Sequence, residues 1–269
     1  MTTTATRQTA GPLSLLRQGS GEPLVLLHPL ALAGELWAPL AERFTDPVDM
    51  ITPDLRGHGR SDWDGRPFSI ADLADDVVAM LDALDLPSVH LLGMSMGGSV
   101  AMTLAGRFPD RVRSLVLADT TAWYGPKART AWTERAEKAA GVPRPKQLTF
   151  QVDRWFSEEF RAANPTEVGR VSDIFLRTDS KAHAAASVAM GELDSRALLP
   201  SITASTLVLV GEHDYATPPA MAAALAEAIP SAGLQVLPRV RHLSLIEQPD
   251  LAGLVDEHVR ASRALREAR

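Results

Sequence analysis

Residues 91–98 read Leu91-Leu92-Gly93-Met94-Ser95-Met96-Gly97-Gly98 and carry the most informative local pattern of the chain. They start in an apolar run, Val89–Leu92, and lead into a helical pattern that begins near Ser99. The spacing G-x-S-x-G places the serine on a sharp turn between a buried strand and a helix. A larger residue in place of the flanking glycines would collide with the adjacent helix or strand. The pattern therefore predicts Ser95 as a nucleophile on a strained turn.

Apolar runs similar to the one before Ser95 recur along the chain. Each is short, mostly continuous rather than alternating, and ends at Gly, Pro, Asp or His, as buried parallel strands do. Between two of them, Ile70–Leu84 has apolar residues at helical spacing with acidic residues on the opposite face. This rhythm predicts an α/β fold with a mostly parallel central sheet and helices on both faces. The runs are Leu24–Leu27, Met50–Thr52, Val89–Leu92, Leu115–Ala118 and Thr206–Val210.

The rhythm stops between Ala122 and Asp194. This part is charged, rich in Ala and Trp, and shows several short helical patterns but no convincing strand. We expect residues 122–194 to form a helical cap, inserted into a core made of residues 1–121 and 195–269. Beyond the insertion the rhythm resumes. The expected elements are a helix near Pro219–Ala228, a strand near Leu234–Leu237 and a closing helix over about Pro249–Arg266.

The composition narrows the class of protein. With 45% hydrophobic and 22% charged residues, the 269-residue chain is typical of a globular protein with a sizeable core. The net charge of -6 offers no global positive field for nucleic acid or an anionic membrane. The absence of cysteine excludes disulfides, thiolate nucleophiles and Cys-ligated metals. Neither the polar Met1–Gly11 nor the interrupted apolar stretch Val25–Ala41 signals export or membrane insertion, so we expect a cytoplasmic protein.

A serine nucleophile needs a base, and the base needs an orienting acid. In the α/β-hydrolases, whose nucleophile turn the G-x-S-x-G stretch resembles, the serine is followed along the chain by the acid and then by the histidine, both on loops after late strands. Asp214 directly follows the run Thr206–Val210, and His242 follows the last expected strand by a few residues. The sequence therefore predicts a catalytic triad of Ser95, Asp214 and His242.

Other assignments are weaker. Glu212 is the runner-up acid, and His58, on the loop after the run Met50–Thr52, is an alternative base. A structural role is favoured for His58, because the triad is complete without it. His213 is adjacent to Asp214 on the same loop and is expected to pack against that loop. No pair of histidines has the spacing of H-E-x-x-H, so we expect no metal site and no cofactor.

The tetrahedral intermediate of acyl transfer needs N–H donors aimed at its oxyanion. One comes from the residue after the nucleophile and the other from the loop after an early strand. Met96 meets the first requirement. Leu30 is the better candidate for the second, because the preceding Pro29 has no N–H. The predicted oxyanion hole is therefore formed by Leu30 and Met96.

Over almost its entire length, the chain resembles the α/β-hydrolase superfamily. Within it, the chain is similar to the 3-oxoadipate enol-lactonases of aromatic catabolism, through Leu115–Thr121, Arg154–Phe156 and His242–Pro249. Two positions depart from that group: Ala31 where glycine is frequent, and Asp119 where asparagine is common. The superfamily markers are His28-Pro29-Leu30 with Trp37, Arg56–Asp62, Gly93–Gly98, Phe108–Val112, Gly211–Asp214 with Thr217-Pro218, and His242–Ser244 with Glu247–Pro249.

The resemblance implies a serine hydrolase that opens a lactone or ester through an acyl-enzyme, without a cofactor, as a monomer or homodimer. The enol-lactone carries a carboxylate whereas the chain is net acidic, so a cation should face the pocket. Arg154 and Arg161 in the cap are the candidates, with Trp123 and Trp155 as further substrate-binding residues.

Other functions on the same fold stay open at this point. One is a general carboxylesterase or a lactonase acting on natural products. Another is a cofactor-free perhydrolase or haloperoxidase-like enzyme that uses a peracid formed at Ser95. A third is a non-catalytic receptor, which an intact triad disfavours, because a receptor does not need one.

Overall fold

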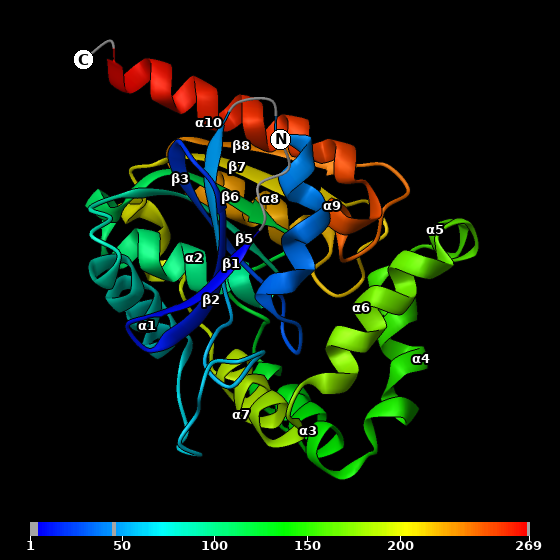
Figure 1. The fold of residues 1–269 in the computed structure, drawn as a ribbon. Coiled ribbons are helices and arrows are strands. Elements are labelled where there is room, and N and C mark those ends of the chain that lie inside the picture. Colours follow the sequence, from blue (N-terminus) through cyan, green and yellow to red (C-terminus); the bar gives the residue numbers. More distant parts are fainter. Residues whose placement is uncertain (1–4, 45–46, 268–269) are drawn as a thin grey trace.

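A sheet of eight strands forms the centre of the computed structural model, which describes residues 5–44 and 47–267 (Figure 1). The strand order is β1-β2-β4-β3-β5-β6-β7-β8. All strands from β4 to β8 in this order are parallel, and β2 runs antiparallel to both of its neighbours, β1 and β4. The strands are β1 Thr6–Ala10, β2 Leu13–Gly19, β3 Glu22–Leu27, β4 Val48–Pro53, β5 Val89–Met94, β6 Val112–Ala118, β7 Ser205–Gly211 and β8 Ala232–Leu237.

Each apolar run expected to be a strand lies in one, and the predicted α/β fold with a mostly parallel central sheet is confirmed. The β1–β2 hairpin lies outside the predicted strands. β1 is mostly polar and partly exposed, because it forms an edge of the sheet, and it lacks the continuous apolar run of a central strand.

Helices cover both faces of the sheet (Figure 1). α1 Ile70–Ala83 packs on α2 Met96–Arg107, and α2 packs on β3, β5 and β6. α8 Pro219–Ala228 lies against β7 and β8, and the 3₁₀ helix η3 Arg196–Ser201 contacts both α2 and α8. On the other face lie the 3₁₀ helix η1 Gly34–Arg43 and α10 Ala252–Glu267, which contact each other.

Local sequence explains where these helices begin. Ser69 and Asp72 form a capping box at the start of α1, which confirms the helix predicted over Ile70–Leu84. α2 begins at Met96, earlier than the predicted start near Ser99, because the turn at Ser95 leads directly into the helix. The closing helix starts at Ala252, after the short 3₁₀ turn η4 Pro249–Leu251.

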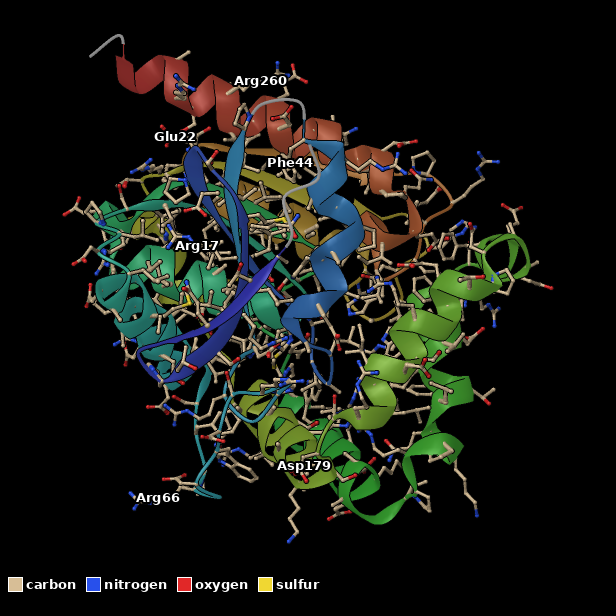
Figure 2. The ribbon with its side chains drawn as sticks, viewed as in Figure 1. Arg17, Glu22, Phe44, Arg66, Asp179 and Arg260 are labelled. Carbon is tan, nitrogen blue, oxygen red and sulfur yellow. The ribbon has the colours of Figure 1, made fainter. Side chains whose placement is uncertain are left out.

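Helices α3 to α7, here called the α3–α7 segment, connect β6 to β7 and lie outside the layers of the sheet (Figure 1). The two ends of the connection meet, since Trp123 and Asp194 form an isolated antiparallel bridge. Asp179, labelled in Figure 2, caps α7 by accepting hydrogen bonds from the backbone amides of Lys181 and Ala182. The helices are α3 Ala128–Gly141, α4 Arg144–Trp155, α5 Glu158–Ala163, α6 Pro165–Arg177 and α7 Ser180–Gly191.

The α3–α7 segment shares the hydrophobic core of the sheet. Its Phe156 and Phe175 are fully buried and belong to the same apolar cluster as Trp37 of η1 and the strand residues. Burying one such side chain stabilises the fold by about 1.5–3 kcal/mol, so the segment is held firmly on the core. Among the residues that the structure describes, no helix is both long and apolar enough to cross a membrane.

Candidate active site

Ser95 occupies a strained turn between β5 and α2. Its backbone has φ 55° and ψ −119°, in a region where a side chain costs about 1–3 kcal/mol of strain. Two hydrogen bonds hold this conformation. The Ser95 amide donates to the carbonyl of Ala118 at 2.9 Å, and the hydroxyl of Thr120 donates to the Ser95 carbonyl at 2.7 Å.

The glycines around Ser95 are required by close backbone approaches. A Cβ on Gly93 would lie 2.2 Å from the carbonyl oxygen of Gly97, and one on Gly97 would lie 2.1 Å from that of Leu27. A Cβ on Gly98 would lie 2.6 Å from the Thr120 side chain. The collisions expected from the sequence would therefore occur in this fold, and the turn also lies close to the loop after β3.

The structure brings Ser95, Asp214 and His242 together. The Ser95 hydroxyl lies 2.9 Å from Nε2 of His242, and Nδ1 of His242 lies 2.8 Å from Oδ2 of Asp214. All three side chains are buried. Because an ionised carboxylate only accepts hydrogen bonds, Nδ1 donates to Asp214 and Nε2 accepts the serine proton. This is the arrangement in which a histidine activates a hydroxyl nucleophile.

Asp214 is held by its own loop. Its Oδ1 accepts the backbone amides of Ala216 at 2.7 Å and Thr217 at 3.0 Å, and its Oδ2 accepts the Thr217 hydroxyl at 2.7 Å. Burial by itself would raise the pKa of Asp214. The charge of His242 and the hydrogen bonds from His242 and Thr217 outweigh burial, so the pKa lies below its ordinary value of 3.8.

A second carboxyl, Asp119, lies buried beside Asp214. Its Oδ1 accepts the amide of Gly211 and its Oδ2 accepts the amide of Ser244, each at 3.0 Å. Burial, followed by the negative charge of Asp214, raises the pKa of Asp119 well above its ordinary value. From sequence alone Asp119 stands out only as a departure from the enol-lactonases. Its contact with both loops depends on tertiary structure.

The loop after β3 carries Leu30, whose backbone amide, like that of Met96, donates to no other described group. His28 shapes this loop: its Nδ1–H donates to the Pro29 carbonyl at 2.8 Å, and its Nε2 accepts the Leu55 amide at 2.9 Å. Ala31, where the enol-lactonases frequently have glycine, adopts φ 61° and accepts a hydrogen bond from Thr178 at 2.8 Å. Ala31 thus adopts a left-handed backbone conformation, which glycine usually takes, in this loop.

The competing residues do not contact Ser95 or His242 in the structure. Nδ1 of His58 donates to the carbonyl of Arg56 at 3.0 Å, and burial, followed by the charge of His28, lowers the pKa of His58 to about 3. Glu212 instead accepts the amide of Arg239 at 3.0 Å, and His213 is exposed. The loop of His58 supports the loop of Leu30, because Asp54 accepts the Gly34 amide at 2.8 Å.

The two predicted arginines differ in their surroundings. Arg161 on α5 pairs with Asp153 at 3.1 Å, which neutralises its charge. Arg154 on α4 has a buried Nε without a hydrogen-bond partner among the described residues. Substrate binding by either residue stays a prediction, and of the two only Arg161 has an ion-pair partner among the described residues.

The two predicted tryptophans lie at different depths. The ring of Trp123 lies under the guanidinium of Arg196, 3.8 Å from it. Trp155 is buried against Phe175, and its carbonyl accepts the amide of Leu243 at 3.1 Å, beside His242. Contact of either ring with substrate stays a prediction.

Nothing in the described part of the chain gathers three or more His, Asp or Glu side chains in a way that could hold a metal ion.

Comparison with known proteins shows the family to which the chain belongs. The sequence profile of the family described as the alpha/beta hydrolase fold matches residues 22–249. The chain belongs to the α/β-hydrolase family. It is 31% identical over 232 residues to 3-oxoadipate enol-lactonase 2 of Acinetobacter baylyi, covering 86% of this chain and 86% of that protein. The predicted resemblance is therefore confirmed.

Solved structures of α/β-hydrolases agree with this placement. An enol-lactonase from Burkholderia xenovorans superposes with a TM-score of 0.87 at 28% identity, covering 95% of this chain and 100% of that one. A thermophilic esterase from Thermogutta terrifontis, solved with malate bound, also superposes with a TM-score of 0.87, at 30% identity, covering 96% and 99% of the two chains. The relatives of this α/β-hydrolase thus include both lactonases and esterases.

Proposed function

We propose that the protein is a serine hydrolase that opens an enol-lactone of the 3-oxoadipate type through an acyl-enzyme. The observation that carries the proposal is the line of contacts from Ser95 through His242 to Asp214, at 2.9 and 2.8 Å, on a strained strand-to-helix turn. Similarity to 3-oxoadipate enol-lactonase 2 supports the lactone as substrate.

In the first half of the reaction, the Ser95 oxygen attacks the lactone carbonyl while Nε2 of His242 takes the hydroxyl proton. The resulting oxyanion accepts hydrogen bonds from the amides of Leu30 and Met96. Asp214 stabilises the imidazolium through Nδ1. The carbonyl–oxygen bond of the ring then breaks, and the ring oxygen leaves as an enolate, a better leaving group than an alkoxide. The enolate takes the proton from Nε2 of His242, which leaves the imidazole neutral for the second half.

In the second half, a water molecule attacks the acyl-enzyme and gives up a proton to Nε2 of His242. The second tetrahedral intermediate uses the same two amides. Its collapse breaks the bond to the Ser95 oxygen, which recovers its proton from His242, and releases the carboxylic acid. No cofactor takes part in either half of this proposed mechanism.

We also propose that residues 122–194 act as a cap over this site, with residues 1–121 and 195–269 as the catalytic core. The ends of the inserted part meet at the Trp123–Asp194 bridge. The cap is tied to the loop of His242, because the Leu243 amide donates to Trp155 and Glu247 accepts the amide of Ser157 at 3.1 Å. The cap would therefore shape the pocket next to the histidine.

A carboxylesterase is the second candidate, favoured by the 30% identity to the Thermogutta terrifontis esterase. A panel of 3-oxoadipate enol-lactone and neutral 4-nitrophenyl esters separates the two candidates. We expect the enol-lactone to have the higher kcat/KM. A clear preference for neutral esters would favour the esterase.

The serine mechanism has its own test. Ser95→Ala should lower kcat by about 10³-fold or more on every substrate, because the nucleophile is lost. Ser172→Ala is the matched control, since Ser172 is a buried serine that donates to a backbone carbonyl in α6. Hydrolysis that survives in Ser95→Ala, or no hydrolysis of any ester or lactone by the wild-type protein, would contradict the proposal.

A further inference from the structure

Asp153, near the end of α4, contacts both loops that carry the proposed acid and base. Its Oδ1 lies 3.0 Å from Nη1 of Arg241, the residue before His242. Its Oδ2 accepts a hydrogen bond at 3.3 Å from the hydroxyl of Tyr215, the residue after Asp214. One carboxylate of the α3–α7 segment therefore reaches both loops.

The last turn of α4 runs beside the loop of the proposed base. The backbone carbonyl of Asp153 also accepts a hydrogen bond from Nη1 of Arg241. Two residues further along the helix, the carbonyl of Trp155 accepts the amide of Leu243 at 3.1 Å. His242 thus lies between two residues that are each bound to the end of α4. A shift of this helix end would move both chain neighbours of the base.

Arg241 and Tyr215 depend on Asp153 for their side-chain polar contacts. In the part of the chain that the structure describes, every ion pair and hydrogen bond of the Arg241 side chain goes to Asp153. The Tyr215 hydroxyl likewise has Asp153 as its partner. The Arg241 guanidinium also lies 5.8 Å from the centre of the Tyr215 ring. These three residues, here called the Asp153 link, form one connected group.

The Asp153 carboxylate stays ionised in this group. The hydrogen bond and the charge of Arg241, and the charge of Arg161, hold the pKa of Asp153 below its ordinary value of 3.8. The Asp153 side chain is 47% exposed. Exposed ion pairs contribute little to stability, so the link should matter for the position of the loops more than for folding.

Each of the two loops is therefore held at two points. Asp119 binds a backbone amide of each loop within the buried core, and Asp153 binds a side chain of each from the α3–α7 segment. A loop held at a single point can rotate about that point, and the second contact restricts this rotation. The restriction matters because a misplacement of about 1 Å at a reacting group can lower the rate by about 100-fold.

We propose that Asp153 is a positioning residue, which acts through Arg241 and Tyr215 on the two loops of the triad. This inference rests on the proposed hydrolase function. It gives α4 a part in the alignment of His242 for proton transfer, in addition to covering the site. Because the link acts on the base rather than on the substrate, its loss should slow the chemical step and leave substrate binding nearly unchanged.

Single-turnover kinetics with 4-nitrophenyl acetate test the Asp153 link. Asp153→Ala should lower the saturating rate of acylation about tenfold and change the half-saturating concentration by less than about twofold. Asp194→Ala is the matched control and should keep the wild-type rate, because Asp194 is also 47% exposed and pairs with Arg196 at 2.7 Å. An unchanged rate in Asp153→Ala, a change confined to half-saturation, or an equal loss of rate in both variants would overturn the inference.

A double-mutant cycle tests whether Asp153 acts through Arg241. Arg241→Met should lower the acylation rate by a similar factor. Adding Asp153→Ala to it should then lower the rate by less than about twofold more, because the contact is already lost. If the two effects multiply as independent ones do, Asp153 does not act through Arg241 and the inference is wrong.

The proton on Nδ1 of His242, which lies between His242 and Asp214, provides a measurement that does not depend on turnover. Its low-field NMR line should shift or broaden in Asp153→Ala and stay unchanged in Asp194→Ala. If the line is the same in wild type and both variants, the link is wrong even when esters are hydrolysed. If the line changes as expected but the wild-type protein hydrolyses no ester or lactone, the hydrolase function fails and the Asp153 link stands.

Discussion

The carboxyl of Asp119 accepts a hydrogen bond at 3.0 Å from the backbone amide of Ser244, two residues after His242. The other oxygen of the same carboxyl accepts the amide of Gly211, three residues before Asp214, also at 3.0 Å. One buried side chain at the end of β6 thus holds both the loop of the proposed acid and the loop of the proposed base. The relative position of Asp214 and His242 depends on it.

Asp119 should make stability depend on pH. A carboxyl whose pKa is higher in the folded than in the unfolded protein stabilises the fold fully below its ordinary value of 3.8, and this contribution is lost as pH rises through the raised pKa. In Asp119→Asn the side chain cannot ionise, so the variant does not lose this stability as pH rises. The difference in Tm, variant minus wild type, should therefore increase between about pH 4 and pH 8. A difference that stays constant over this range, measured by thermal unfolding, would show that Asp119 does not titrate in this way.

The hydroxyl of Thr217 should position Asp214. It donates to Oδ2 of Asp214 at 2.7 Å, the same oxygen that His242 contacts, and it is fully buried. Thr217→Val should lower kcat about tenfold with a smaller change in KM, and should lower the free energy of unfolding by about 1–3 kcal/mol. Thr103→Val, at a buried threonine that bonds Ser99 and Ser195, is the control. Equal effects of the two substitutions on kcat would argue for a general loss of stability.

Glu247 should couple the α3–α7 segment to the loop of His242. Its two carboxylate oxygens accept the amides of Ser157 and Arg241, each at 3.1 Å. Glu247→Ala leaves both amides without this partner, so we expect kcat/KM to fall about tenfold on neutral and anionic esters alike. Hydrogen exchange should become faster at Ser157 and Arg241. Unchanged exchange at both amides would mean that the link does not hold the segment.

Glycine positions offer a contrast within one protein. Gly97→Ala places a Cβ 2.1 Å from the backbone oxygen of Leu27, so this variant should lose more than about 3 kcal/mol of stability or fail to fold. Gly169, within α6, has no atom within 4 Å of an added Cβ. Gly169→Ala should stabilise the protein by about 1 kcal/mol, because alanine favours a helix. Thermal and urea unfolding measure both, and a destabilised Gly169→Ala would contradict the described packing of α6.

Much of the fold and of the candidate site is encoded in short stretches. The continuous apolar runs predict the central strands, because a strand buried on both faces excludes polar residues. The spacing of small residues around Ser95 predicts its turn, since the collisions that demand glycine occur within a few residues and against the adjacent strand. Asp214 and His242 are predicted from their places directly after strands, and the structure brings them within hydrogen-bond reach of each other. The β1–β2 hairpin escapes prediction, because an edge strand is not required to be apolar.

Charge compensation, in contrast, follows only from the packed chain. The sequence singles out Arg154 and Arg161 equally, but Asp153 pairs with Arg161, whereas nothing in the described structure pairs with Arg154. The sequence gives no sign that Arg135 of α3 and Arg154 of α4 line one pocket. Local patterns therefore determine the fold, the proposed nucleophile and its partners. The pocket and its charge depend on which side chains α3 and α4 bring together, and residues distant in the chain meet only after the α3–α7 segment packs against the sheet.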